Sequence, residues 1–328
     1  MTRGFFGREE KNAVMRVLDS GNLSGYLAGT LQAGPEVVAL EQEWAQYFLG
    51  SHPGGAHAVA MNSATSCLIA ACGAIGLKAG DEVIVPPLTM SASATAPMVY
   101  GATPIFADIE PNYFCLDPDS VEAKITERTK AIVVVDLFGQ PYDSIAINFL
   151  AAKHNLFVIE DASQAPGARE YHRSGTYGHI GVFSLNHHKH IQTGEGGIAW
   201  TQHSELAQKM RLLANHAEAA RQPYFGFNFR MTEIQAAIGR VQLTRLAKIV
   251  CDRQKKATFY RQIGLPLAPV RPGCEHAWYL YPFLFSEAPL SKDFFKYNPP
   301  LYQLPVFGEQ KPLPVTEDIW EKLWMLKP

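Results

Sequence analysis

Apolar residues follow two alternating patterns along the first 214 positions of the chain. Short apolar runs, each long enough for one buried strand, alternate with stretches whose apolar residues recur at helical spacing. The runs predict strands at 56–61, 82–85, 103–107, 131–135, 156–159 and 198–201. The periodic stretches predict helices at 9–18, 36–48, 66–75, 120–125, 144–154 and 204–214. Apolar strands separated by helices predict an α/β fold with a mostly parallel sheet covered on both faces.

The pattern changes beyond residue 230, where a strong amphipathic helix is predicted. Its apolar face consists of Met231, Ile234, Ile238, Val241 and Leu246. We expect this helix to connect a large domain, residues 1–250, to a small C-terminal domain, residues 251–328. The small domain is rich in proline and aromatic residues, and the pattern assigns no secondary structure to it.

Composition restricts the partners and the compartment. The 29 Lys and Arg residues nearly balance the 31 Asp and Glu residues without clustering, which argues against nucleic acid or an anionic membrane as the main partner. The five cysteines form no C-x-x-C motif and indicate reduced thiols in a cytoplasmic protein. We expect no signal peptide, because the N-terminus has no basic segment followed by an apolar core, and no membrane span, because no apolar stretch is long enough for a bilayer.

Three features predicted at the carboxyl ends of strands suggest one chemistry. Lys189 lies in a glycine-rich turn, FSLNHHKHIQTGEGG at 183–197; Asp161 ends an apolar strand; and a small-residue turn at 62–65 enters an alanine-rich helix. Ligands of such sheets bind at the carboxyl ends of strands. A phosphate cradle, a buried acid and a lysine are what a protein needs to hold pyridoxal 5'-phosphate (PLP).

Each of these features has a role in that chemistry. Lys189 would bind the cofactor aldehyde as a Schiff base, which requires a pKa lowered by burial or by a nearby cation. Asp161 would pair with the protonated ring nitrogen. Ala64 and Thr65 would donate backbone N–H groups to the phosphate at a helix N-terminus. A surface lysine and an ordinary helix-capping acid are the simpler interpretations of the same residues.

These segments resemble the DegT/DnrJ/EryC1/StrS family of PLP-dependent aminotransferases, the sugar aminotransferases of fold type I. The resemblance extends from residue 6 to about residue 320 and is weaker after residue 281, where the small domain looks shortened relative to the family. It rests on the Lys189 turn, on Asp161, and on Ser163-Gln164-Ala165, where the family usually has Ala at position 163. A fold type I architecture, like that of aspartate aminotransferase, is therefore expected.

The resemblance implies further cofactor-binding residues. Gln164 would contact the 3'-oxygen of PLP, and Ser184 would bind its phosphate. Met90 would cover the pyridine ring, where the family usually has an aromatic residue; a core methionine is the competing interpretation. Asn228 would reach the phosphate from a neighbouring subunit, so the resemblance implies a homodimer with a shared active site.

The resemblance also implies the reaction. An amino group would pass from an amino acid, L-glutamate by expectation, to a nucleotide-linked keto sugar, with Lys189 moving the proton between Cα and C4'. Three alternatives stay open: a keto-cyclitol or other ketone as acceptor, a PLP-dependent sugar dehydratase, and a non-catalytic binding or regulatory protein. The family's dehydratases have His in place of the lysine, so Lys189 argues against the second.

Three histidines beside Lys189 raise the question of a metal site. His187, His188 and His190 lie in one short loop, without helical i, i+4 spacing and without a nearby cysteine. Zinc sites usually show one of these arrangements. We therefore expect no metal among the cofactors, and we expect a pocket-lining role for one of the histidines instead.

Overall fold

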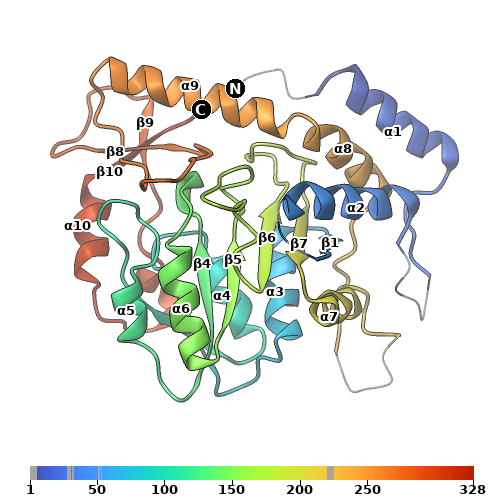
Figure 1. Ribbon diagram of the computed structural model, residues 1–328, viewed down its shortest axis with the longest axis horizontal. Helices are drawn as coiled ribbons and strands as arrows, with labels where there is room; N and C mark the ends of the chain where they lie inside the picture. Colours follow the sequence, from blue (N-terminus) through green and yellow to red (C-terminus); the bar gives the residue numbers. More distant parts are fainter. Residues whose placement is uncertain (1–5, 28–30, 32, 51, 53, 220–224) are drawn as a thin grey trace.

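A seven-stranded sheet forms the centre of the molecule (Figure 1). The computed structural model describes residues 6–27, 31, 33–50, 52, 54–219 and 225–328. The strands, in the order β1-β7-β6-β5-β4-β2-β3, are β1 (His57–Met61), β7 (Gly197–Thr201), β6 (Ile180–Ser184), β5 (Phe157–Asp161), β4 (Thr129–Val135), β2 (Glu82–Val85) and β3 (Thr103–Phe106). Among these seven strands, only β7 runs in the direction opposite to the rest. The predicted mostly parallel sheet is confirmed, and the carboxyl ends of the other six strands lie at one edge.

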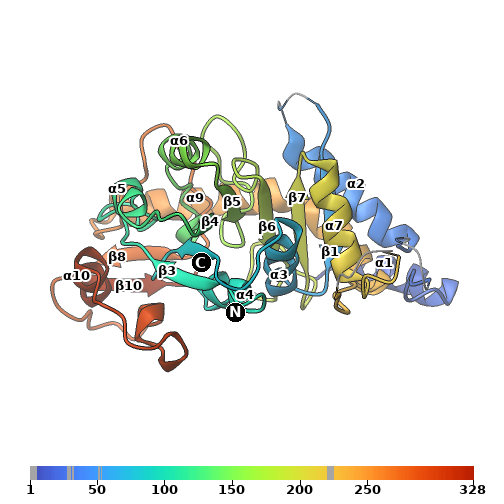
Figure 2. The ribbon, with the colours of Figure 1, turned by 90° about the horizontal axis from the view of Figure 1, so that it is seen from below.

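Helices cover both faces of this sheet, as Figure 2 shows for α5 and α6 on one side and α3 and α4 on the other. The first face packs against α3 (Ala64–Ala74), α4 (Ala92–Met98) and α7 (Ser204–Ala214). The second face packs against α5 (Pro118–Glu122) and α6 (Ser144–His154) over β4 and β5, and against α2 (Pro35–Leu49) over β6 and β7. Successive residues of each strand therefore enter different cores.

Local capping explains where predicted and observed helices differ. The bounds predicted for β2, α6 and α7 agree with the structure. Helix α3 begins two residues earlier than predicted, because the Ser63 side chain accepts the N–H of Ser66 at 3.1 Å. Helix α5 begins at Pro118 and ends at Glu122, because Asp117 caps it and a proline suits the first position of a helix. Helix α4 was not predicted from the sequence.

The single helix predicted beyond residue 230 is wrong in its extent. The chain forms α8 (Glu233–Leu243), which Thr232 and Gln235 cap reciprocally, and then α9 (Leu246–Gln262). Ile234, Ile238 and Val241 are only half-buried. The first and last of them pack against α1 (Arg8–Ser20). The fully buried side of α8 is formed instead by small and polar residues: Glu233, Ala236, Ala237, Gly239 and Gln242, together with Leu243.

The last part of the chain forms a second sheet. Strands β8 (Tyr281–Leu284), β10 (Leu323–Leu326) and β9 (Phe294–Lys296) pair antiparallel in that order, and α10 (Pro314–Lys322) precedes β10. Short 3-10 helices at Leu301–Gln303 and Pro305–Phe307 lie between β9 and α10. The boundary predicted at 250/251 falls inside α9, and the division into two domains stays a prediction.

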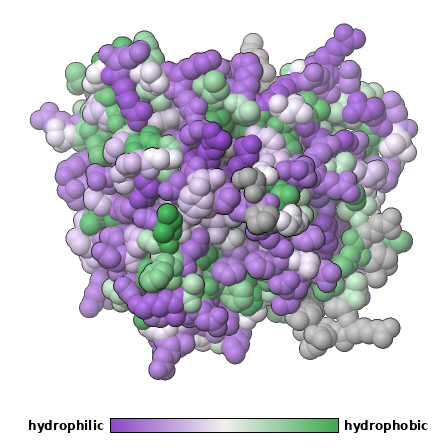
Figure 3. Space-filling model, viewed as in Figure 1, coloured by the Kyte–Doolittle hydropathy of each residue, from purple (hydrophilic) through white to green (hydrophobic). Residues whose placement is uncertain are grey.

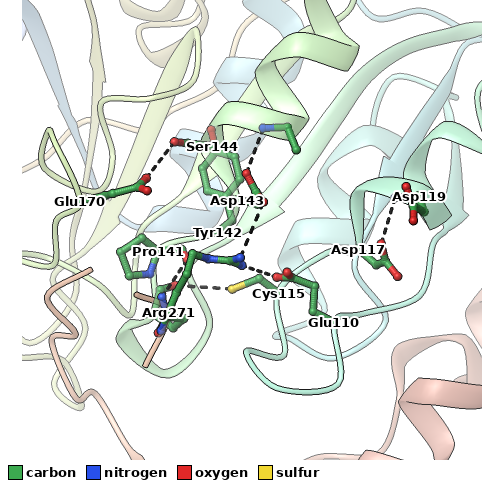
Figure 4. A network of polar contacts seen from close by, with 12 residues as sticks. Glu110, Cys115, Asp117, Asp119, Pro141, Tyr142, Asp143, Ser144, Glu170 and Arg271 are labelled. Carbon is green, nitrogen blue, oxygen red and sulfur yellow. Dashed lines mark hydrogen bonds and ion pairs between the residues drawn. The ribbon is translucent and has the colours of Figure 1, made fainter. Parts of the chain in front are cut away.

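An ion-pair network ties the segment before β8 to the large sheet (Figure 4). Arg271 pairs with Glu110, and its Nη1 lies 3.7 Å from Asp143 Oδ2. Asp143 also caps α6 by accepting the N–H of Ala146 at 2.9 Å. One guanidinium thus connects the C-terminal part of the chain to the start of α6.

The face seen in Figure 3 is mostly hydrophilic, with scattered hydrophobic residues. Such scattered apolar residues are ordinary on protein surfaces. Among the residues that the structure describes, no helix is both long and apolar enough to cross a bilayer.

Candidate active site

Four strands bring the predicted site residues to one edge of the sheet. Asp161 is the last residue of β5, and Ser184 is the last residue of β6. The turn at 62–65 follows β1 directly, and Met90 follows β2 after a short loop. These four strands point the same way, so the residues at their carboxyl ends face a common region.

Lys189 lies in a closed loop between β6 and β7. The loop is held by backbone hydrogen bonds of 2.9 Å from Leu185 N–H to Gly196 O and from His187 N–H to Gly194 O. Gly194 has φ +83°, a conformation that favours glycine, at the turn of the loop. The loop therefore has the closed backbone that can hold one lysine in place.

The Lys189 side chain is half-buried, and its Nζ lies 4.5 Å from the centroid of the Tyr279 ring. Burial lowers the pKa of Lys189 to about 8, while the negative charge of Asp161 opposes the shift. A lowered pKa leaves a usable fraction of neutral amine near pH 7, which a lysine nucleophile requires.

Asp161 is 6% exposed, and both of its carboxylate oxygens accept hydrogen bonds. Oδ1 accepts the N–H of Ser163 at 3.1 Å, and Oδ2 accepts the hydroxyl of Ser93, on α4, at 3.1 Å. Sequence reasoning missed Ser93. The signal that could have found it is a serine in the segment that follows β2, a strand whose carboxyl end lies at the same edge as Asp161.

The turn after β1 presents the N-terminus of α3. Ser63 caps this helix, and Ala64 and Thr65 occupy its first two positions. The N–H groups of these positions have no acceptor within the helix. A Cβ at Gly197 would lie 2.4 Å from the backbone nitrogen of Ala64, so only glycine lets β7 start this close to the turn. The geometry leaves backbone donors free for an anion.

Gln164 is buried beside the turn that follows β4. Its Oε1 accepts the N–H of Phe138 at 2.8 Å, and its Nε2 donates to the hydroxyl of Tyr297 at 3.4 Å. Phe138 has φ +59°, an uncommon value for a residue other than glycine. Each hydrogen bond uses one side of the amide, and one N–H of Nε2 is left for a further acceptor.

Three other predicted residues line the same edge. The Ser184 hydroxyl, almost buried, accepts the N–H of Asn186 at 3.2 Å. Met90 is 52% exposed. Asn228 is exposed, and its backbone oxygen accepts a hydrogen bond from Asn62 Nδ2 at 3.2 Å. Asn228 therefore lies next to the turn of its own chain, with its surface open to solvent.

The histidines beside Lys189 have different surroundings. His190 is buried with its Nε2 2.8 Å from Ala277 O, and burial holds its pKa well below the usual range, so the ring is neutral. His187 and His188 are exposed. Within the described ranges, no group of three His, Cys, Asp or Glu side chains has the geometry to hold a metal ion.

Two tyrosines contact the site without having been assigned to it from the sequence. Tyr279 lies under Lys189, and its N–H donates to Phe138 O at 2.7 Å. Tyr297 is buried behind Gln164, and burial raises its pKa. Both come from the C-terminal part of the chain, where the hydrophobic pattern carries little information, so only tertiary structure places them.

Comparison with known proteins gives consistent results. The model of the DegT/DnrJ/EryC1/StrS aminotransferase family matches residues 6–327. The chain is 41% identical over 258 residues to GDP-perosamine synthase of Caulobacter vibrioides, covering 77% of this chain and 66% of that protein. It is 38% identical over 263 residues to L-glutamine:2-deoxy-scyllo-inosose aminotransferase of Streptomyces kanamyceticus, covering 75% of this chain and 60% of that protein.

Among solved structures, the crystal structure of DesV of S. venezuelae in complex with a ketimine intermediate superposes with a TM-score of 0.86. The two chains are 34% identical, and the superposition covers 97% of this chain and 88% of DesV. The likeness therefore includes the second, C-terminal sheet as well as the large one.

Proposed function

Because this chain belongs to the DegT/DnrJ/EryC1/StrS aminotransferase family, we propose that it is a PLP-dependent aminotransferase whose acceptor is a nucleotide-linked keto sugar. The expected amino donor is L-glutamate. One observation carries the proposal: an amine of lowered pKa, Lys189, lies near the buried carboxylate of Asp161, at the strand edge that also carries the α3 N-terminus. The five free cysteines support the cytoplasm as its compartment.

The donors at this edge fit a phosphorylated pyridine aldehyde. The N–H groups of Ala64 and Thr65, with the Ser184 hydroxyl, would hold the phosphate. Asp161 would hold the protonated ring nitrogen, and the remaining N–H of Gln164 would bind the 3'-oxygen. When bound, PLP supplies the electron sink for the carbanion at the substrate Cα.

The chain's own residues supply binding and proton transfer. Lys189 would attach the cofactor and, once displaced by the donor, its Nζ would move the proton between the substrate Cα and C4'. Met90, exposed at the site edge, would lie against the ring face.

A second copy of the chain would complete the site. Asn228 is exposed and lies beside the phosphate turn of its own chain. We propose that in a homodimer its side chain reaches the phosphate of the partner's site, so that neither subunit holds the cofactor fully alone.

The acceptor is supported by names of relatives. GDP-perosamine synthase is named for a nucleotide sugar, and this supports a keto sugar carried on a nucleotide. The relative named for 2-deoxy-scyllo-inosose supports a keto-cyclitol as the second candidate. Both acceptors require the same residues around the cofactor, so they differ only in the second half of the reaction.

The absorbance spectrum of the purified protein tests the proposal. With PLP we expect a visible band that L-glutamate bleaches, and we expect Lys189→Ala to lack that band while the exposed-lysine control Lys153→Ala keeps it. A nucleotide keto sugar should then restore the band. Restoration by a keto-cyclitol alone would favour the second candidate.

Two other results would overturn the aminotransferase. A visible band that no amino donor bleaches would favour a different PLP reaction, such as dehydration, or a binding role. The absence of any band in the wild-type protein would contradict PLP as the cofactor.

A further inference from the structure

Ser93 is a buried hydroxyl that reaches the carboxylate of Asp161 from helix α4. Its side chain is 0% exposed, and its Oγ donates to Asp161 Oδ2 at 3.1 Å. The other oxygen, Oδ1, accepts the N–H of Ser163 at 3.1 Å. Donors from two separate segments thus hold the two oxygens. A carboxylate held in this way cannot rotate about its Cβ–Cγ bond without losing a hydrogen bond.

The turn that carries Ser93 also carries Met90. The N–H of Ser93 donates to Met90 O at 3.3 Å, which fixes the serine relative to the end of the loop from β2. Met90 is exposed at the site edge, whereas Ser93 points into the core shared with β5. One short turn therefore connects the ring-facing position to the carboxylate.

We propose that Ser93 is a positioning residue that fixes the plane of the Asp161 carboxylate toward the ring nitrogen of PLP. The inference rests on the proposed function, because that function assigns Asp161 to the ring nitrogen. An O–H donor stabilises the charged form of a carboxylate. A charged, fixed partner keeps the ring nitrogen protonated, and a protonated ring withdraws electrons most strongly. Ser93 acts through Asp161 and does not touch the cofactor.

A purely structural role makes a different prediction. If the Ser93 hydroxyl only joins α4 to β5, its loss lowers the stability of the fold and leaves the chemistry of the bound ring unchanged. If it positions Asp161, the protonation of the lysine-bound cofactor changes even where folding does not. The two roles therefore separate in a spectroscopic measurement.

The experiment uses Ser93→Ala and, as a variant of nearly the same volume with a weak donor, Ser93→Cys. Without substrate, we expect the pH midpoint of the visible band to rise by about half a unit or more, because a less protonated ring withdraws less charge from the imine nitrogen. With L-glutamate, we expect kcat for the first half-reaction to fall roughly tenfold while KM barely changes.

Controls separate the Ser93 inference from its premise. Thr95→Val removes a half-buried hydroxyl two positions along α4, which points to another side of the helix, and should leave the midpoint unchanged. In an Asp161→Asn background, Ser93→Ala should add no further loss of kcat, because its effect passes through Asp161.

Three results would decide the matter. A wild-type midpoint and rate in both Ser93 variants would overturn the positioning role while leaving the aminotransferase intact. A full additional loss in the Asp161→Asn background would overturn it as well. If the wild-type protein forms no visible band, the proposed function itself fails. Ser93→Cys keeps the test open if Ser93→Ala does not fold.

Discussion

Two neighbouring carboxylates at the end of β5 enter opposite faces of the sheet and meet opposite conditions. Glu160 points toward the α6 face, is fully buried, and accepts N–H groups from Gly175, Tyr177 and Gly178 at 2.5, 2.8 and 3.0 Å. Asp161 points toward the α3 and α4 face and accepts one N–H and one hydroxyl.

The difference shows how a buried carboxylate that stabilises the fold can be told from one that is available for chemistry. Glu160 accepts hydrogen bonds from the backbone of one loop and from the side chain of Asp136, so this carboxylate organises the fold. Asp161 has fewer donors, lies at the strand end beside Lys189, and keeps capacity for a cation. Burial alone does not distinguish the two, whereas the number and origin of the donors do.

The largest expected effect is a loss of activity when the charge of Asp161 is removed. Asp161→Asn keeps the shape and removes the charge. We expect the rate of amino transfer to fall by about 10²- to 10³-fold, as when a preorganised electrostatic partner is lost. Urea unfolding should show a stability equal to or above that of the wild type, because a buried charge is gone. A loss of both activity and folding would contradict this assignment.

The matching change on the other side is Glu160→Ala. It leaves three N–H groups, one buried and two part-buried, without their acceptor, and we expect the free energy of unfolding to fall by about 3 kcal/mol or more. Activity per folded molecule, measured at low temperature, should stay near the wild-type value. If Glu160→Ala instead abolished activity in folded protein, the contrast between the two carboxylates would collapse.

The sequence predicted that two acidic residues end a buried strand, but it did not predict which of them faces the cofactor side of the sheet. Apolar runs of strand length located β5 and its acidic end, because a fully buried strand excludes polar residues except where it reaches an edge. Alternation along a strand implies that Glu160 and Asp161 point to different faces. Which face holds the cofactor side depended on the resemblance, because both faces are apolar.

Contacts between distant segments lay beyond sequence reasoning. Ser93 meets Asp161 across 68 positions, and no periodicity marks such a pair. Likewise, helical spacing continues through residues 244–245, where the chain breaks into α8 and α9, so the pattern gave one helix in place of two. Local patterns specify elements and caps, whereas packing between elements selects the functional partners.

A third prediction concerns the pH dependence of stability at the buried acids around Glu160. Asp136, which directly follows β4, is fully buried beside Glu160, and both burial and the Glu160 charge raise its pKa. The protonated form is thus favoured in the folded state. The proton bound to Asp136 stabilises the folded state fully below the pKa of Asp136 in the unfolded chain, about 4. This stabilisation is lost as the pH rises through the pKa of Asp136 in the folded state.

Asp136→Asn should remove this dependence. In the window between the two pKa values, the wild type should lose up to about 1.4 kcal/mol of unfolding free energy per pH unit, and the variant should show a flatter profile. Urea titrations at a series of pH values measure both slopes, with the exposed Asp19→Asn as control. Equal slopes in Asp136→Asn and wild type would place the pH dependence elsewhere.

The smallest expected effect is a change in the pKa of Lys189 when Tyr279 is replaced. The centroid of the Tyr279 ring lies 4.5 Å from Lys189 Nζ. Two influences of the ring oppose each other: as a π-surface it favours the ammonium form by about 0.5 to 2 kcal/mol, and as an apolar cover it favours the neutral amine. Tyr279→Phe preserves both influences, whereas Tyr279→Leu keeps the apolar cover and removes the π-surface. If the cation–π contact dominates, Tyr279→Leu lowers the pKa of Lys189 below its value of about 8, and the pH profile for reaction of cofactor-free protein with PLP moves to lower pH. An unchanged profile would mean that Tyr279 acts chiefly by excluding water, which leucine also does.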